Sequence, residues 1–206
     1  WAWFIPLKGG EYSIGLVYDQ RITELPAGKN LGERLLSVLN THPAAREMLE
    51  IAKWQKGDVH FRRNISYSCS TYSTDGAVLV GDAAGFIDPF YSPGLDWVTF
   101  TTSAAVALID SSFRGKPVPP QVAQHNTNFQ LSYARTFRAL YKNKYHYLGD
   151  YELMSLAFRL DLGLYYLGVV NLPFKYGSRS LEVPPFTHSN AKWPFRLMEL
   201  YNRRFA

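Results

Sequence analysis

The segment from Val78 to Gly94 holds the side chains best suited to chemistry in this sequence. A wholly apolar run at 77–80 stops at Gly81-Asp82, which predicts a buried strand with a carboxylate at its carboxyl end. Ligands of open α/β sheets bind outside that edge of the sheet. The small residues at 83–85 let a ligand approach the backbone closely. The pattern therefore predicts a ligand site centred on Asp82.

A long helix rich in Ala, Val, Thr and Leu is predicted from Gly94 to Phe113, after a loop that contains Pro89 and Pro93. The amino terminus of a helix offers unpaired N–H groups and a partial positive charge, which favour an anion. A carboxylate that accepts from hydroxyls, followed by such a terminus, suits a ligand with polyol and anionic character, as flavin dinucleotide has. Gly-Asp alone is more typical of a turn that Asp82 merely caps, so the interpretation depends on the whole arrangement.

The same segment resembles the second flavin-binding motif of the flavoproteins that include aromatic hydroxylases, geranylgeranyl reductases and flavin-dependent halogenases. The likeness to halogenases is greatest, and it covers the strand at 78–80, Gly-Asp-Ala-Ala at 81–84, Asp88-Pro89 and Ser92-Pro93-Gly94. Residues 1–6, Trp-Ala-Trp-Phe-Ile-Pro, are similar to the Trp-x-Trp-x-Ile-Pro signature of halogenases, although an aromatic strand of no special function has the same composition.

The resemblance implies a role for individual residues. Asp82 would hydrogen-bond the ribityl chain of FAD, and the loop from Pro89 to Gly94 would lie beside the isoalloxazine ring. The helix that begins at Gly94 would point its dipole at the N1–C2 region of the flavin. The cofactor-binding residues so implied are Gly81, Asp82, Ala83, Pro89, Ser92, Pro93 and Gly94, and those on the substrate side are Trp1, Trp3, Pro6 and Tyr91.

Parts of the halogenase pattern have no counterpart in this sequence. No Gly-x-Gly-x-x-Gly follows a strand-like run, so the pyrophosphate-binding turn is missing. In the family, that turn and the lysine that handles hypohalous acid both lie upstream of the position of Trp1. We therefore expect the chain to be the C-terminal part of an FAD-dependent oxidoreductase, whose N-terminal part holds the adenine end of the flavin.

Two substitutions bear on halide chemistry. Tryptophan halogenases have a glutamate where this chain has Tyr91, and they hold halide with backbone N–H groups at the positions of Pro93 and Gly94. Proline has no N–H, and a desolvated anion that loses one donor loses on the order of a few kcal/mol. The sequence thus predicts a halogenase-like architecture and leaves the use of halide open.

Composition limits the remaining classes of function. The formal net charge of +5 is modest, and the basic residues interleaved with aromatics at 133–144 indicate a solvated face on a packed helix, not a nucleic-acid stripe. The single Cys69 excludes an intrachain disulfide, and the five histidines show no metal spacing, so no metal site is predicted. Charges within the apolar stretch 153–174 favour a buried or amphipathic helix over a membrane span. The expected location is the cytoplasm.

The predicted fold class is α/β, as a fragment of a two-domain FAD-binding fold. A hairpin at 1–18, helices at 31–39 and 44–54, and strands at 59–63 and 65–72 would form the substrate-side domain of residues 1–76. Residues 77–115 would return to the FAD-binding sheet with its last strand and helix. Residues 116–206 would form a helical C-terminal region, with a proline-bearing tail from Asn171 that wraps the surface.

The predicted function is FAD-dependent oxidation, of the halogenase or monooxygenase kind, of an apolar and aromatic small molecule. The implied partners are that substrate, the N-terminal part of the same protein and, where reduced flavin is supplied from outside, a flavin reductase; nucleic acid is not expected. Two alternatives stay open. One is a flavin-dependent reductase of an isoprenoid or lipid-like substrate, with residues 162–174 at a membrane surface. The other is a non-catalytic fragment that no longer binds flavin.

Overall fold

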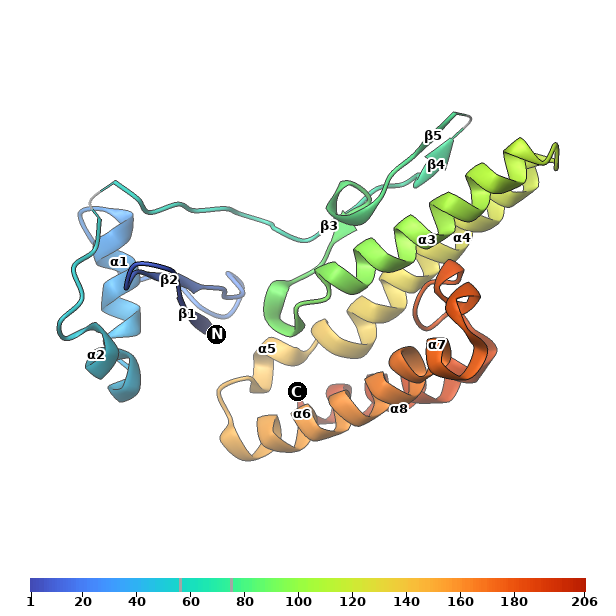
Figure 1. Ribbon diagram of the computed structural model, residues 1–206. Helices are drawn as coiled ribbons and strands as arrows, with labels where there is room; N and C mark the ends of the chain where they lie inside the picture. The colour runs from blue at the N-terminus through green and yellow to red at the C-terminus, as the bar shows by residue number, and fades with distance from the viewer. Residues whose placement is uncertain (56, 75) are drawn as a thin grey trace. The chain divides into compact units, whose positions relative to one another are not determined.

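The computed structural model describes residues 1–55, 57–74 and 76–206 (Figure 1). The chain divides into two compact units, Trp1–Arg63 and Asn64–Ala206. This division differs from the predicted boundary at residues 76–77. Strand β3 (Tyr67–Ser68) pairs with β6 (Gly85–Phe86), and β4 (Ser73–Thr74) pairs with β5 (Ala77–Val78), so the hydrogen bonds of residues 64–76 tie them to the second unit.

The first unit is a hairpin with two helices. Strands β1 (Ala2–Pro6) and β2 (Tyr12–Leu16) pair antiparallel, as the alternating pattern predicted. Helix α1 (Leu31–Leu39) has the predicted bounds, and the side chain of Asn30 caps it. Helix α2 (Pro43–Leu49) is shorter than the prediction of 44–54. The predicted strand at 59–63, a range that the structure describes throughout, is not formed.

The second unit is mainly helical. Helix α3 (Gly94–Phe113) has the predicted bounds and lies beside α4 (Val118–Thr136) (Figure 1). Helices α6 (Tyr151–Tyr165) and α8 (Lys192–Phe205) lie beside each other. The core of this unit includes Tyr72, Ala84, Phe100 and Phe129. The other helical elements, some of them short 3-10 or π segments, are η1 (Gly81–Ala83), η2 (Pro89–Tyr91), η3 (Phe137–Tyr141), α5 (Lys144–Tyr147), α6 (Tyr151–Tyr165), η4 (Tyr166–Val170), α7 (Asn171–Tyr176), η5 (Ser178–Glu182), η6 (Ser189–Ala191) and α8 (Lys192–Phe205).

The apolar run at 77–80 is not enclosed as predicted. Only Ala77 and Val78 form a strand, and the side chain of Val80 is 40% exposed. Within the described part of the chain, each sheet is an antiparallel pair of strands. The α/β class therefore holds with small sheets and a high share of helix, and the larger two-domain flavin fold remains a prediction.

The prediction that the C-terminal tail wraps the surface is wrong for residues 192–206. These residues form helix α8, whose inner face carries Phe195, Met198, Tyr201 and Asn202, all of them buried. The spacing of these four is that of one helix face. Pro194 does not prevent the helix, because the N–H groups of a first turn have no intrahelical partner in any case.

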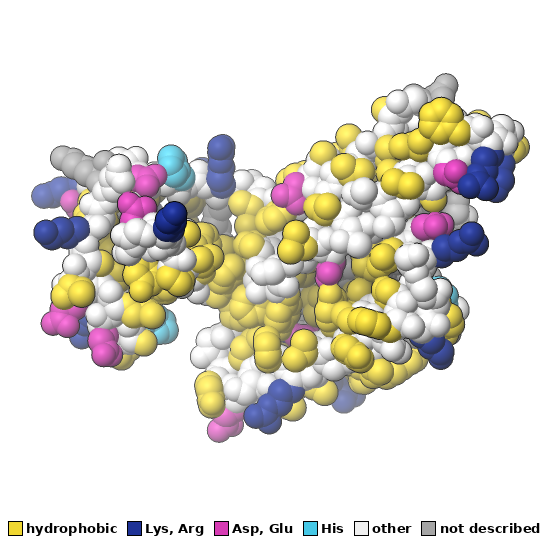
Figure 2. All heavy atoms as spheres, in the orientation of Figure 1, with side chains coloured by type: hydrophobic (Ala, Val, Ile, Leu, Met, Phe, Trp, Pro, Cys, Tyr) yellow, Lys and Arg dark blue, Asp and Glu magenta, His cyan; other side chains and the backbone are white. Residues whose placement is uncertain are grey.

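One helical stretch, Tyr151–Tyr176, is long and apolar enough to cross a membrane by length and composition alone. The mean hydropathy of its most apolar window is 1.4, and 28% of that window is buried. Its inner face includes the buried carboxylate of Asp161, while Phe158, Leu162 and Tyr166 are exposed. Figure 2 shows hydrophobic side chains gathered on the surface over these C-terminal helices. One such stretch among the described residues is weak support for a membrane span, since core helices of other proteins can be equally long and apolar.

Candidate functional site

The turn at Gly81 sets the geometry of the predicted ligand site. Gly81 has φ +54, and a Cβ atom added there would lie 2.9 Å from Cγ2 of Val98 on α3. Both observations explain why a glycine occupies this position: other residues rarely adopt this backbone conformation, and their Cβ atom would clash with Val98 on α3. The Gly81 N–H donates to the Thr101 hydroxyl at 2.8 Å, and this hydroxyl in turn donates to the Trp97 carbonyl at 2.6 Å. Thr101 therefore fixes the turn to the helix.

Replacing Thr101 with valine is expected to destabilise the folded protein by about 1–3 kcal/mol, because the buried Gly81 N–H loses its acceptor. Urea denaturation of the full-length protein would measure the loss. Thr99→Val is the matched control, since the Thr99 hydroxyl donates to the Leu95 carbonyl on an exposed part of the same helix. Equal losses in the two variants would contradict the role assigned to Thr101.

Asp82 lies at the middle of the turn with its side chain exposed. Its backbone carbonyl accepts from the Tyr67 hydroxyl, whereas its carboxylate has no hydrogen-bond partner among the residues that the structure describes. Val80 and Val98 are exposed apolar neighbours, at 40% and 43%. A carboxylate available for hydroxyl groups, with apolar side chains around it, suits a ligand that carries both a polyol and an apolar ring.

The loop from Asp88 to Gly94 connects this turn to α3. Asp88 caps η2, since its carboxylate accepts from the Phe90 N–H at 2.8 Å. Ser92 follows with φ 51 and ψ 46, a left-handed conformation that costs about 1–2 kcal/mol for a residue with a side chain. Pro93 is the N-cap of α3, and its carbonyl accepts from the Trp97 N–H at 2.9 Å. The loop is thus held in one defined shape.

The amino end of α3 has room for a ligand. A Cβ atom added to Gly94 would have no other atom within 4 Å, and Leu95, on the same turn, is 81% exposed. The first N–H groups of a helix have no intrahelical acceptor and favour negative charge. This end of α3 and the Asp82 carboxylate fit the ribityl and ring portions of a flavin in donor and acceptor character.

A buried charge network, not predicted from the sequence, lies behind the loop. Nζ of Lys144 donates to Oδ2 of Asp161 at 2.6 Å, and these side chains are 1% and 4% exposed. The same carboxylate accepts from the hydroxyls of Tyr91, at 2.6 Å, and Tyr201. The only sequence signal was a lone carboxylate in the apolar stretch 153–174.

Burial governs protonation in this network. Burial lowers the pKa of Lys144, and the charge and hydrogen bond of Asp161 act in the opposite direction. Burial, with Asp161 as a second cause, raises the pKa of Tyr91 and of Tyr201 far above the ordinary value. Both hydroxyls are therefore protonated donors at neutral pH.

The structure brings the predicted cofactor residues together in the second unit. The turn at 81–83 and the loop at 89–94 both adjoin α3 and belong to one compact body. Tyr91 lies on the same loop. The other predicted substrate residues belong to the first unit, where the Trp3 ring covers Gly15 and the Trp1 and Trp3 rings are 5.7 Å apart. Pro6 ends β1 and is exposed. The ligand contacts of all these residues remain predictions.

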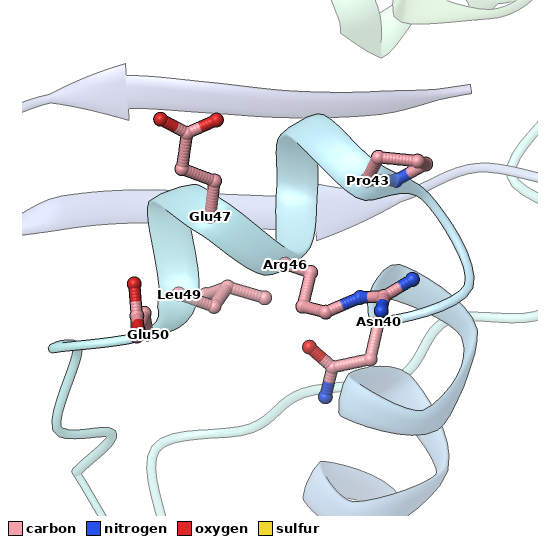
Figure 3. A pocket seen from close by; sticks show the side chains of 6 residues that line it. All are labelled: Asn40, Pro43, Arg46, Glu47, Leu49 and Glu50. Atoms are coloured by element: carbon pink, nitrogen blue, oxygen red, sulfur yellow. The ribbon is translucent and has the colours of Figure 1, made fainter.

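A well-defined hollow in the first unit contains none of these residues. It has a volume of about 500 Å³ and lies between α2 and the end of α1, lined by Asn40, Pro43, Arg46, Glu47, Leu49 and Glu50 (Figure 3). Its lining is mainly polar and charged surface side chains, which gives no arrangement for catalysis. Among the described residues, no three His, Cys, Asp or Glu side chains lie close enough together to share a metal ion.

Comparison with known proteins places the chain in a class of flavin-dependent oxidoreductases. It belongs to the tryptophan halogenase family, which matches residues 1–148. It is 34% identical over 141 residues to the flavin-dependent halogenase ascD of Acremonium egyptiacum, an overlap that covers 66% of this chain and 25% of that protein. No solved structure matches the chain.

Two halogenases of Armillaria mellea extend the comparison. Flavin-dependent halogenase armH5 is 33% identical over 122 residues, covering 56% of this chain and 23% of armH5. Flavin-dependent halogenase armH4 is 30% identical over 173 residues, covering 76% of this chain and 32% of armH4. The chain thus spans about a quarter to a third of the length of the relatives that it matches.

Proposed function

We propose that the full-length protein is an FAD-dependent, halogenase-like oxidoreductase that acts on an apolar, aromatic small molecule. One observation carries the proposal: an exposed carboxylate, Asp82, lies on a turn that Thr101 fixes against the amino-terminal half of α3. Membership of the tryptophan halogenase family, and the flavin-dependent halogenases among its relatives, support flavin as the ligand of this turn.

The residues of this chain would bind and orient the cofactor. Asp82 would accept hydrogen bonds from ribityl hydroxyls, and the glycine and alanine beside it would let the flavin approach the backbone. The loop from Pro89 to Gly94 would contact the ring, and the amino end of α3 would favour negative charge there by about 0.3–1 kcal/mol. The flavin itself, when bound, supplies the redox chemistry.

Trp1, Trp3 and Pro6 of the first unit, and Tyr91 of the second, would each contribute to binding of the substrate. The half-buried rings of Trp1 and Trp3 offer apolar, aromatic surface. The N-terminal part of the same protein would complete the dinucleotide site. A flavin reductase would supply reduced flavin, and the protein would work in the cytoplasm.

Of the two alternatives, the reductase of a lipid-like substrate is supported by the exposed apolar side chains of residues 156–174. The halogenase names of ascD, armH5 and armH4 favour the halogenase-like function over it. The non-catalytic alternative is decided by whether the full-length protein binds flavin.

The test is the visible absorption spectrum of the full-length protein, titrated with FAD. We expect a bound-flavin spectrum in the wild type and an affinity about 10–100-fold weaker in Asp82→Ala, because hydrogen bonds to a charged acceptor contribute about 1.5–3 kcal/mol. Asp110→Ala is the matched control, since Asp110 is an exposed carboxylate at the other end of α3 and pairs with Arg114 at 2.8 Å. A wild-type protein without a flavin band in excess FAD would overturn the proposal.

A further inference from the structure

Three tyrosine hydroxyls join residues 88–96, which follow the predicted flavin turn, to the helices at 145–165. Tyr145 donates to Oδ2 of Asp88 at 2.6 Å, Tyr91 donates to Oδ2 of Asp161 at 2.6 Å, and Tyr165 donates to Oδ2 of Asp96. Each bond links residues at least 57 positions apart. In each pair, one member lies within residues 88–96 and the other within residues 145–165, so these bonds are tertiary links between the same two regions.

The Tyr145 link acts on the start of the loop. Asp88 is buried, and its two carboxylate oxygens have different partners, since Oδ1 accepts from the Phe90 N–H and Oδ2 accepts from Tyr145. The side chain that caps η2 is therefore itself oriented by α5. Loss of the Tyr145 hydroxyl would remove one of the bonds that orient the Asp88 carboxylate at the cap.

The Tyr91 link acts on the middle of the loop. Its acceptor, Asp161, is held by Lys144, the residue that precedes Tyr145 on α5. The Tyr91 ring packs against Phe90, Tyr141 and Phe158, with ring centroids 4.6 to 6.3 Å apart. One short helix, α5, thus supports the loop at two points.

The Tyr165 link acts on the first turn of α3, where Asp96 lies. An acidic side chain in the first turn faces the partial positive charge of the helix end. Tyr165 holds the Asp96 carboxylate toward α6.

We propose that Tyr91, Tyr145 and Tyr165 form a clamp through which the C-terminal helices position the flavin-facing loop and the amino end of α3. The inference rests on the proposed function and extends it to residues outside the family motif. All three are positioning residues, because their hydroxyls are bound to carboxylates of the protein. For Tyr91 this means that its hydroxyl points into the protein, and its ring alone is left to contact a substrate.

Two phenylalanine variants of the full-length protein test the clamp against a matched control. Tyr91→Phe and Tyr201→Phe each remove a hydroxyl from the same carboxylate, Asp161, but Tyr91 lies on the loop and Tyr201 on α8. We expect Tyr91→Phe to weaken FAD binding about tenfold, equivalent to one lost hydrogen bond, and to shift the visible circular dichroism of the bound flavin. We expect Tyr201→Phe to change neither, because Tyr201 binds the other oxygen, Oδ1, and Lys144 still holds the Oδ2 that accepts from Tyr91; the variant lowers only the unfolding midpoint.

A second pair of variants, and a measurement made without flavin, test the positions of these residues independently of cofactor binding. Tyr145→Phe should act as Tyr91→Phe does, and Tyr147→Phe, whose hydroxyl donates to Asn202 instead, should act as Tyr201→Phe does. Amide hydrogen exchange of residues 88–96, measured without flavin, should accelerate in Tyr91→Phe and Tyr145→Phe only.

The outcomes separate the clamp from the proposed function. A wild-type protein that binds no flavin overturns the proposed function and, with it, the flavin-positioning role. A wild-type protein that binds flavin, together with loop variants that match the two controls in affinity, dichroism and exchange, overturns the clamp alone.

Discussion

Replacing Lys144 with methionine is expected to destabilise the folded protein by about 3–5 kcal/mol, the usual cost of removing one partner of a buried ion pair. Lys144 and Asp161 are almost fully buried, so the carboxylate that remains would be a charge without its cation. Two tyrosine hydroxyls still donate to Asp161, which moderates the loss but does not neutralise the charge. Equilibrium urea denaturation of the full-length protein would measure the change in the free energy of unfolding.

Two further variants make the interpretation specific. Lys142→Met removes a charge from an exposed position two residues earlier and should change the free energy by about 0.5 kcal/mol or less. Lys144→Met combined with Asp161→Asn removes both charges and should recover a large part of the loss, since neutral groups are far less costly to bury. A Lys144→Met variant as stable as Lys142→Met would show that the pair is not buried in solution.

Local patterns were sufficient to predict α1, α3 and the first hairpin. The bounds of α3 follow from Pro93 before its first residue and from Gly115 shortly after its last, with apolar and helix-favouring residues between them. The hairpin follows from period-two alternation across a loop with two glycines at positive φ. In each case the deciding interactions lie within a few residues of one another in the chain.

The predictions of strands at 59–63 and 65–72 were wrong in length, because they depended on residue types alone; of these residues, only Tyr67–Ser68 forms a strand. Tyr, Phe, Ile and Val favour strands where they pack against a sheet, but β3 meets only the two residues of β6. The same limit applies to Ala77–Val80, whose apolar character predicted an enclosed strand. Strand length is set by the partners available, and those cannot be deduced from the run itself.

The candidate cofactor residues could be proposed from the sequence because they form one contiguous motif, whereas the residues that hold this motif in place could not. Thr101 is 20 residues from Gly81, and Tyr145 is 57 residues from Asp88. The sequence around an isolated threonine or tyrosine in a helix does not indicate which distant residue it will hydrogen-bond. Asp161 alone had one, because a carboxylate in an apolar helix must be paired or hydrogen-bonded when buried.

Replacing Met198 with alanine is expected to destabilise the protein by about 2–5 kcal/mol, because the cavity left in a packed core adds to the lost burial. Met198 is 0% exposed and belongs to the same core cluster as Phe129 and Phe186. The urea denaturation midpoint would measure this effect. It distinguishes a core helix at residues 192–206 from the surface-wrapping tail that the prolines had indicated.

The neighbouring residue provides the control for this comparison. Leu197 has the same kind of apolar side chain but is 41% exposed, so Leu197→Ala should cost about 1 kcal/mol or less. A surface tail would make the two substitutions equally mild, whereas an amphipathic core helix makes them differ severalfold. Because α8 also carries Tyr201 and Asn202 to Oδ1 of Asp161, the buried packing of Met198 and the Asp161 network belong to the same helix.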